Sequence, residues 1–179
     1  MTWKHLGTQG FGRLVEANDD LAAHLADRIA AADDLEAIPS GRPELSVVCF
    51  RHLPGGPARA ATIEAADPGA LDRYTDRLAT LLQHSGEGWL STTVLRGRTY
   101  LRAGIVNILS SPDAVDAVLT ALGRISPAAA RQAGLPAFDS GTVYRTLTAV
   151  AKQITGSHWN GFVFFGLTNR EGRGAAKHA

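Results

Sequence analysis

The sequence predicts an α+β fold in which helices pack on one face of a small, mostly antiparallel sheet. Three segments carry apolar residues at the spacing of three and four that lines one face of a helix. Between them lie short apolar runs rich in Val and Thr, joined by connections of a few residues, as expected for strands. Strands mixed with helices through short turns favour an α+β layer. The 179 residues, 45% hydrophobic and 20% charged, are typical of a folded soluble protein with one main domain.

The first predicted element is an amphipathic helix over residues 11–33. Its apolar face consists of Phe11, Leu14, Val15, Leu21, Leu25 and Ile29. A short apolar piece at residues 35–39 and a turn at residues 40–43 follow. Residues 45–50 are almost entirely apolar, which predicts a strand buried on both faces with Cys49 as a buried small hydrophobe.

A loop and a second helix come next. Residues 53–61 contain two Gly and two Pro, which predict a loop. Asp67 precedes Pro68, and this pair is typical of a helix start, with Asp67 accepting hydrogen bonds from the free N–H groups of the first turn. The helix is expected to end at the Ser- and Gly-containing residues 85–88.

A hairpin and a third helix complete this region. Residues 89–95 and 98–106 have strand character, and the two-residue connection Arg96-Gly97 predicts an antiparallel hairpin. Ser111 precedes Pro112 and starts a third helix. The apolar face of that helix consists of Val115, Val118, Leu119 and Leu122.

Composition excludes several classes of function. The net charge of +1 gives no general attraction to nucleic acid or to an anionic membrane. A single cysteine excludes an internal disulfide and a cysteine-rich metal site, and no two of the six histidines have metal-site spacing, so we expect no metal ligands. No run reaches the ~20 apolar residues of a membrane span, and the N-terminus has no signal-peptide core, so a cytoplasmic protein is expected.

Three stretches carry a resemblance to a known family. They are residues 3–11 (WKHLGTQGF), 45–51 (LSVVCFR) and 89–107 (WLSTTVLRGRTYLRAGIVN). Together they resemble the C-terminal small domain of the group II (aromatic-amino-acid type) decarboxylases, which use pyridoxal phosphate (PLP), over residues 1–125. The resemblance implies the small-domain fold of the fold-type I PLP enzymes.

The resemblance also implies that the catalytic centre lies outside this region. The Schiff-base lysine of the family belongs to a His-Lys motif upstream of the matched part, whereas the lysines of this chain are Lys4, Lys152 and Lys177. Lys4 lies in the order Trp-Lys-His and is interpreted as a solvated terminal residue. We therefore expect no catalytic or cofactor-binding residue here and no PLP bound by this chain alone. The implied function is that of a truncated carboxy-lyase of amino-acid metabolism, inactive alone.

Three residues are candidates for the domain interface or the substrate side of such an enzyme. Arg102 is a lone charge in an apolar strand and needs a partner, either in a buried ion pair at the interface or in the substrate. Asn107 ends the same strand and serves either turn hydrogen bonding or the substrate side. Trp3 belongs to the tryptophan segment that opens the small domain in the family.

Composition changes after Ile125, and residues 126–138 are predicted as a linker, although residues 126–130 could also start a helix. Residues 139–167 predict a short strand, a helix and a strand, and residues 168–179 are expected to be disordered. The tail motif consists of Tyr144, Gly156, Trp159, Asn160 and Gly161. These residues are similar to the end of the DUF2924 family, although Thr146, Thr148 and Phe162 replace its usual serines and proline.

Three functions follow as hypotheses. The first is a decarboxylase small domain that acts with a separate PLP-binding large-domain chain, as part of a split enzyme. The second is a DNA- or recombinase-associated binding module carried by the tail, although its modest basic character makes nucleic acid the less favoured partner. The third is a non-functional fusion remnant, whose uncovered apolar surface would promote self-association.

Overall fold

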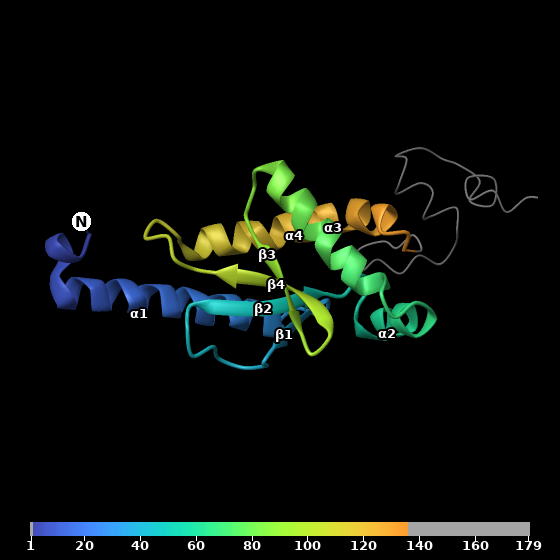
Figure 1. The fold of residues 1–179 in the computed structure, drawn as a ribbon, viewed down its shortest axis with the longest axis horizontal. Helices are drawn as coiled ribbons and strands as arrows, with labels where there is room; N and C mark the ends of the chain where they lie inside the picture. The colour runs from blue at the N-terminus through green and yellow to red at the C-terminus, as the bar shows by residue number, and fades with distance from the viewer. Residues whose placement is uncertain (1, 136–179) are drawn as a thin grey trace, which may run out of the picture. The chain divides into compact units, whose positions relative to one another are not determined.

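The structure is a computed structural model that describes residues 2–135, with side chains from residue 6 onward. In this part of the chain the elements are α1 (Thr2–Ala30), β1 (Leu35–Ile38), β2 (Val47–His52), α2 (Pro57–Ala66), α3 (Ala70–Ser85), β3 (Ser91–Leu95), β4 (Arg98–Gly104) and α4 (Pro112–Gln132) (Figure 1). Helices mixed with antiparallel strands confirm the predicted α+β fold.

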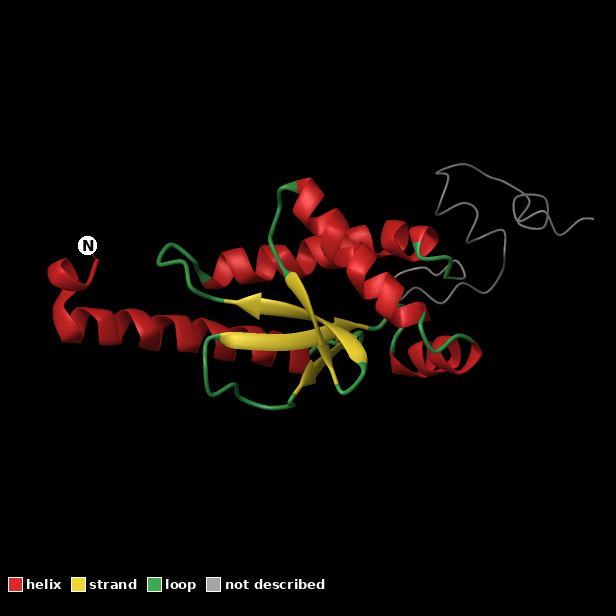
Figure 2. Cartoon of the chain, viewed as in Figure 1, coloured by secondary structure: helices red, strands yellow, loops and turns green. Residues whose placement is uncertain are grey.

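The four described strands form one antiparallel sheet in the order β1-β2-β4-β3 (Figure 2). β3 and β4 are the predicted hairpin, which is confirmed with its turn at Arg96-Gly97. Both turn residues have positive φ, 51° and 76°, as a two-residue turn between twisted antiparallel strands requires. The central pair β2–β4 joins segments that lie about fifty residues apart, with Cys49 opposite Arg102.

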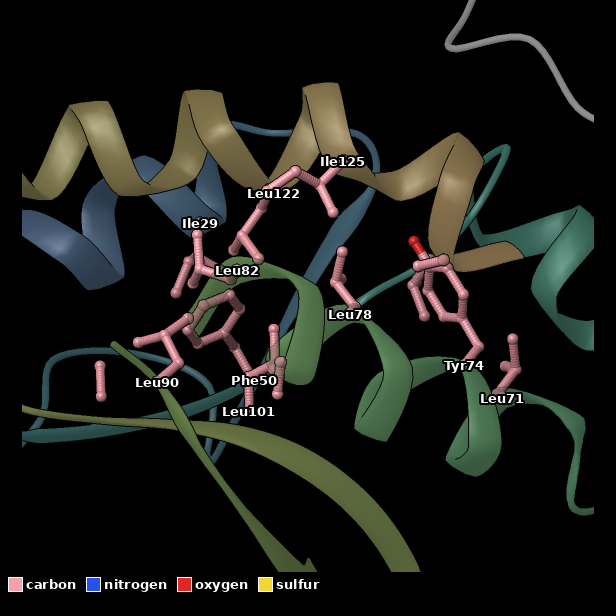
Figure 3. Packing of buried hydrophobic residues seen from close by; sticks show 14 of the residues in the cluster. Ile29, Phe50, Leu71, Tyr74, Leu78, Leu82, Leu90, Leu101, Leu122 and Ile125 are labelled. Carbon is pink, nitrogen blue, oxygen red and sulfur yellow. The ribbon is translucent and has the colours of Figure 1, made fainter. Parts of the chain in front are cut away.

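One hydrophobic core lies between the sheet and the helices α1, α3 and α4. Alternate residues of the two central strands, Val48 and Phe50 in β2 and Leu101 and Ala103 in β4, are buried in it. The helices contribute Leu25, Ile29, Leu78, Leu82 and Leu122. Figure 3 labels the last four of these beside Phe50 and Leu101 of the sheet. Burial of each large apolar side chain contributes roughly 1.5–3 kcal/mol, so this packing fixes which face of each strand points away from the helices.

Two helices differ from the prediction. α1 begins at Thr2 instead of Phe11, and Gly7, with φ 62° and ψ 179°, interrupts its first turns. α2 occupies part of the predicted loop over residues 53–61. Pro57 stands at its first position, where the missing N–H costs no helical hydrogen bond, so a residue interpreted as a helix breaker starts a helix instead.

The predicted cap of α3 is wrong in position. Asp67 follows the end of α2, and its Oδ1 accepts a hydrogen bond from the N–H of Gly69 at 3.1 Å. Gly69 is the N-cap of α3, which begins at Ala70. The carboxylate therefore stabilises the turn between two helices, which the local sequence does not distinguish from a cap.

The start of α4 agrees with the prediction, and its end does not. α4 begins at Pro112, which confirms the predicted helix start, and the Oγ of Ser111 caps it by accepting a hydrogen bond from the N–H of Ala114. The helix continues through Pro127 to Gln132, and Ala129 and Ala130 are buried in the core. Residues 126–132 are thus helical, not a linker, because their small apolar side chains pack against the rest of the domain. The predicted tail elements at residues 139–167 and the predicted disorder of residues 168–179 lie outside the described residues.

Candidate functional site

Arg102 lies in the middle of β4 on the sheet face that points away from the core. It is opposite Cys49 in β2 and opposite Ser91 in β3, whereas the flanking Leu101 and Ala103 point into the core. Its side chain is exposed, and no carboxylate of the described residues lies within salt-bridge distance of the guanidinium. Arg102 therefore forms no ion pair with the described residues, and a partner at a domain interface or in the substrate stays a prediction.

Cys49 is the neighbour of Arg102 across the strands. Its side chain is partly exposed rather than buried, so β2 alternates and is not covered on both faces in its first half. Partial burial raises the pKa of the Cys49 thiol, and the nearby Arg102 charge opposes this effect. The thiol is therefore protonated at neutral pH and is no activated nucleophile.

Asn107 follows β4 and organises the loop that leads to α4. Its Oδ1 accepts a hydrogen bond from the N–H of Leu109 at 2.9 Å, and its carbonyl accepts one from the N–H of Ser110 at 3.0 Å. This confirms the turn hydrogen bonding predicted as one of its two roles. Trp3 lies at the start of α1, but its side chain is outside the described part of the chain, as are the five tail-motif residues.

A pocket of about 190 Å³ opens beside this loop. It is lined by residues of α1, α4, the segment before β3 and the end of β4, among them Leu25, Trp89, Val106, Asn107 and Val115. None of its lining residues carries a charge. The site therefore combines the exposed Arg102 on the sheet face away from the core with an apolar pocket at the end of the same strand.

Arg51 is a buried cation that the sequence reasoning did not single out. Its side chain is only 2% exposed, with Nη1 2.8 Å from Glu64 and Nη2 3.0 Å from Asp72. The guanidinium also lies over the ring of Tyr100, 5.4 Å from the centroid. Asp72 accepts a further hydrogen bond from the backbone N–H of Thr99 at 2.8 Å. These groups neutralise one another, so Arg51 stabilises the fold and is not available to a ligand.

His52 forms a second buried polar group at the end of β2. Its Nδ1 lies 2.6 Å from the hydroxyl of Tyr74, and its Nε2 lies 3.3 Å from Oδ2 of Asp34. The ring thus bridges Tyr74 of α3 and Asp34, which precedes β1. The interaction with His52 lowers the pKa of Asp34, and burial raises the pKa of Tyr74. The phenol therefore stays neutral and links β2 to α3.

Other site types have no representative in the described residues. No cluster of three His, Cys, Asp or Glu side chains there could hold a metal ion. None of the described helices is long and apolar enough to cross a membrane.

Comparisons with known proteins give two kinds of match. The family model "Protein of unknown function (DUF2924)" matches residues 132–168, which confirms the predicted resemblance of the tail. The L-2,4-diaminobutyrate decarboxylase of Rhizobium meliloti (strain 1021) is 28% identical over 123 residues, which are 69% of this chain and 22% of that enzyme.

Solved structures agree with the second match. The glutamate decarboxylase domain of the diaminobutyrate-pyruvate transaminase and L-2,4-diaminobutyrate decarboxylase from Vibrio parahaemolyticus superposes with a TM-score of 0.56 at 22% identity, over 70% of this chain and 24% of that one. Oryza sativa TDC with PLP and tryptamine gives a TM-score of 0.57 at 22% identity, over 69% of this chain and 25% of that one. The resemblance to group II PLP decarboxylases is thus confirmed, and this chain spans about a quarter of their length or less.

Proposed function

We propose that residues 1–125 act as the small domain of a PLP-dependent amino-acid decarboxylase, together with a PLP-binding large domain on a separate chain. The observation that carries this proposal is the exposed guanidinium of Arg102, which has no carboxylate partner among the described residues and lies on the sheet face away from the core. The likeness to decarboxylases over 69–70% of the chain supports the same assignment. DUF2924 is a family of unknown function, so its match favours no second activity.

The chemistry would come from the cofactor, which stabilises the carbanion left by loss of carbon dioxide. The Schiff-base lysine would belong to the large domain, as the resemblance implies, and the described side chains, from residue 6 to residue 135, include no lysine. The role of this chain is to cover one side of the active site, to exclude water from it and to present Arg102. Alone, the chain does not bind PLP and does not decarboxylate.

Arg102 would gain its partner when the large domain covers the sheet. A guanidinium taken out of water without a carboxylate loses several kcal/mol, so the covering surface must supply an acid, either from the large domain or from the substrate. A bidentate guanidinium–carboxylate pair also fixes orientation, which a flexible ammonium does less well. Arg102 therefore acts as the polar anchor of the interface or as the substrate-side cation.

The test uses the full 179-residue chain and the complementary part of the Rhizobium meliloti enzyme, meaning that enzyme without the segment matched here. We expect a complex that releases carbon dioxide from L-2,4-diaminobutyrate. Maleimide should label Cys49, the single cysteine of this chain, about tenfold more slowly in that complex, because Cys49 lies beside Arg102.

Two charge reversals provide the matched comparison. Arg102→Glu should weaken the complex about tenfold or more, whereas Arg77→Glu, an exposed arginine on α3 in the helix layer, should leave it unchanged. Unchanged Cys49 labelling and no carbon dioxide release with the wild-type chain would overturn the proposal.

A further inference from the structure

Four large apolar side chains lie exposed around the pocket at the end of β4, and we call them the apolar corner. They are Trp89, Val106, Ile108 and Leu109, with 76%, 78%, 65% and 83% of their surface exposed. Single exposed apolar residues are common, but a group around a pocket marks an interaction site. The hydrogen bonds of Asn107 hold this loop in place, so the corner is organised before any partner binds.

The pocket has the size and chemistry to accept one apolar side chain. A cavity of about 150 Å³ accepts benzene when it is lined by apolar residues, so about 190 Å³ here holds a phenyl ring or a branched aliphatic group. Leu25 of α1 and Val115 and Val118 of α4 form walls within the rigid helix layer. A side chain at position 88 would meet Val118 at 2.9 Å, so Gly88 permits the close approach of the segment before β3 to α4 beside the pocket.

The first half of α1 extends the same surface. Phe11 and Val15 continue the apolar stripe that reaches the pocket at Leu25, and they are 36% and 42% exposed. Figure 1 shows this half of α1 running past the ends of the strands. Helices in proteins are stabilised mainly by packing of their apolar face, so this stripe indicates a surface that a partner covers.

We propose that the apolar corner is a second contact with the PLP-binding large domain, and that the pocket accepts one aromatic or branched apolar side chain of that domain. This inference rests on the proposed function. Two features favour this occupant over others. The chain spans only 22–25% of the decarboxylases it resembles, so a much larger body would meet its surface. Gly104, which lines the pocket, is two residues from Arg102 on the same face of β4, about 7 Å away, so one partner reaches both.

The test compares two tryptophan substitutions one turn apart on α4. Ala114 lines the pocket and Ala117 does not, although both are exposed. Ala114→Trp should fill the pocket and raise the dissociation constant for the complementary part of the Rhizobium meliloti enzyme at least about tenfold, whereas Ala117→Trp should change it less than about twofold. Circular dichroism and urea midpoints equal to the wild type show that both variants are folded.

The outcomes separate this inference from the function on which it rests. If Arg102→Glu prevents binding but Ala114→Trp binds like the wild type, the pocket is not part of the interface, and the proposed function stands. If the wild-type chain does not bind at all, both fail. If the chain forms a dimer that Ala114→Trp dissociates, a second copy occupies the corner and the inference is wrong.

Discussion

Replacing Arg51 by methionine tests the division of roles between the two arginines of the central strands. Methionine keeps an unbranched apolar stem but is shorter than arginine, so it removes the guanidinium that lies between Glu64 and Asp72 and over the ring of Tyr100. Breaking a buried ion pair from one side costs roughly 3–5 kcal/mol. The carboxylates of Glu64 and Asp72 are 22% and 29% exposed, so water compensates in part.

Each carboxylate also keeps another partner, which places the loss near the lower end of that range. Glu64 remains 3.4 Å from Arg98, and Asp72 keeps the N–H of Thr99. We expect the free energy of unfolding to fall by about 3 kcal/mol. If the free energy of unfolding falls by about 2 kcal/mol per molar urea, the urea concentration at the unfolding midpoint decreases by about 1.5 M.

Urea unfolding followed by far-UV circular dichroism measures this loss, and Arg102→Met is the control. Arg102 has no carboxylate partner among the described residues and is exposed, so its replacement should change the free energy of unfolding by less than about 0.5 kcal/mol. Arg51 is thus assigned a structural role and Arg102 an external partner. This assignment would be refuted if both variants lost the same free energy of unfolding, or if Arg51→Met lost less than about 1 kcal/mol.

Three further substitutions test local features. Tyr74→Phe should cost about 1–2 kcal/mol in urea unfolding, because His52 loses its buried hydroxyl partner; Tyr100→Phe is the control, and an equal loss there would contradict the reasoning. The pKa of Asp34 is lowered in the folded state, so its stabilisation is complete above the unfolded value near 4 and is lost as the pH falls through the lower folded value. Asp34→Asn should therefore flatten the loss of stability as the pH falls below the unfolded value near 4, and parallel curves for variant and wild type would argue against it. Ser111→Ala removes the α4 cap and should cost about 1 kcal/mol, with faster hydrogen exchange in the first turn; unchanged exchange would show that the cap is not needed.

Features coded by neighbouring residues could be predicted from the sequence. The two-residue turn at Arg96-Gly97 defines the hairpin, and Ser111 before Pro112 defines the start of α4. In both cases the signal and the structure it specifies lie within four residues. The α+β class follows from these local signals together with the helical periodicity.

Features that depend on contacts far along the chain could not be predicted in the same way. A lone arginine in an apolar strand indicates that the charge needs a partner, but the same argument applies to Arg51 and Arg102 alike. The register of β2 with β4 places Arg102 on the open face, and α2 and α3 bring Glu64 and Asp72 to Arg51. Nothing near either arginine in the sequence distinguishes these environments.

An open face on an antiparallel sheet is common and does not by itself indicate a partner. Here the groups next to Arg102 on this face are small: the thiol of Cys49, Ser91 and Gly104, whereas the exposed Arg98 lies four residues away on the same face of β4. The exposed Val106 after β4 and Trp89 before β3 add apolar area nearby. A cation whose nearest neighbours are small and apolar suits a surface that becomes dry when covered, because the charge then selects the partner while the apolar area supplies the affinity.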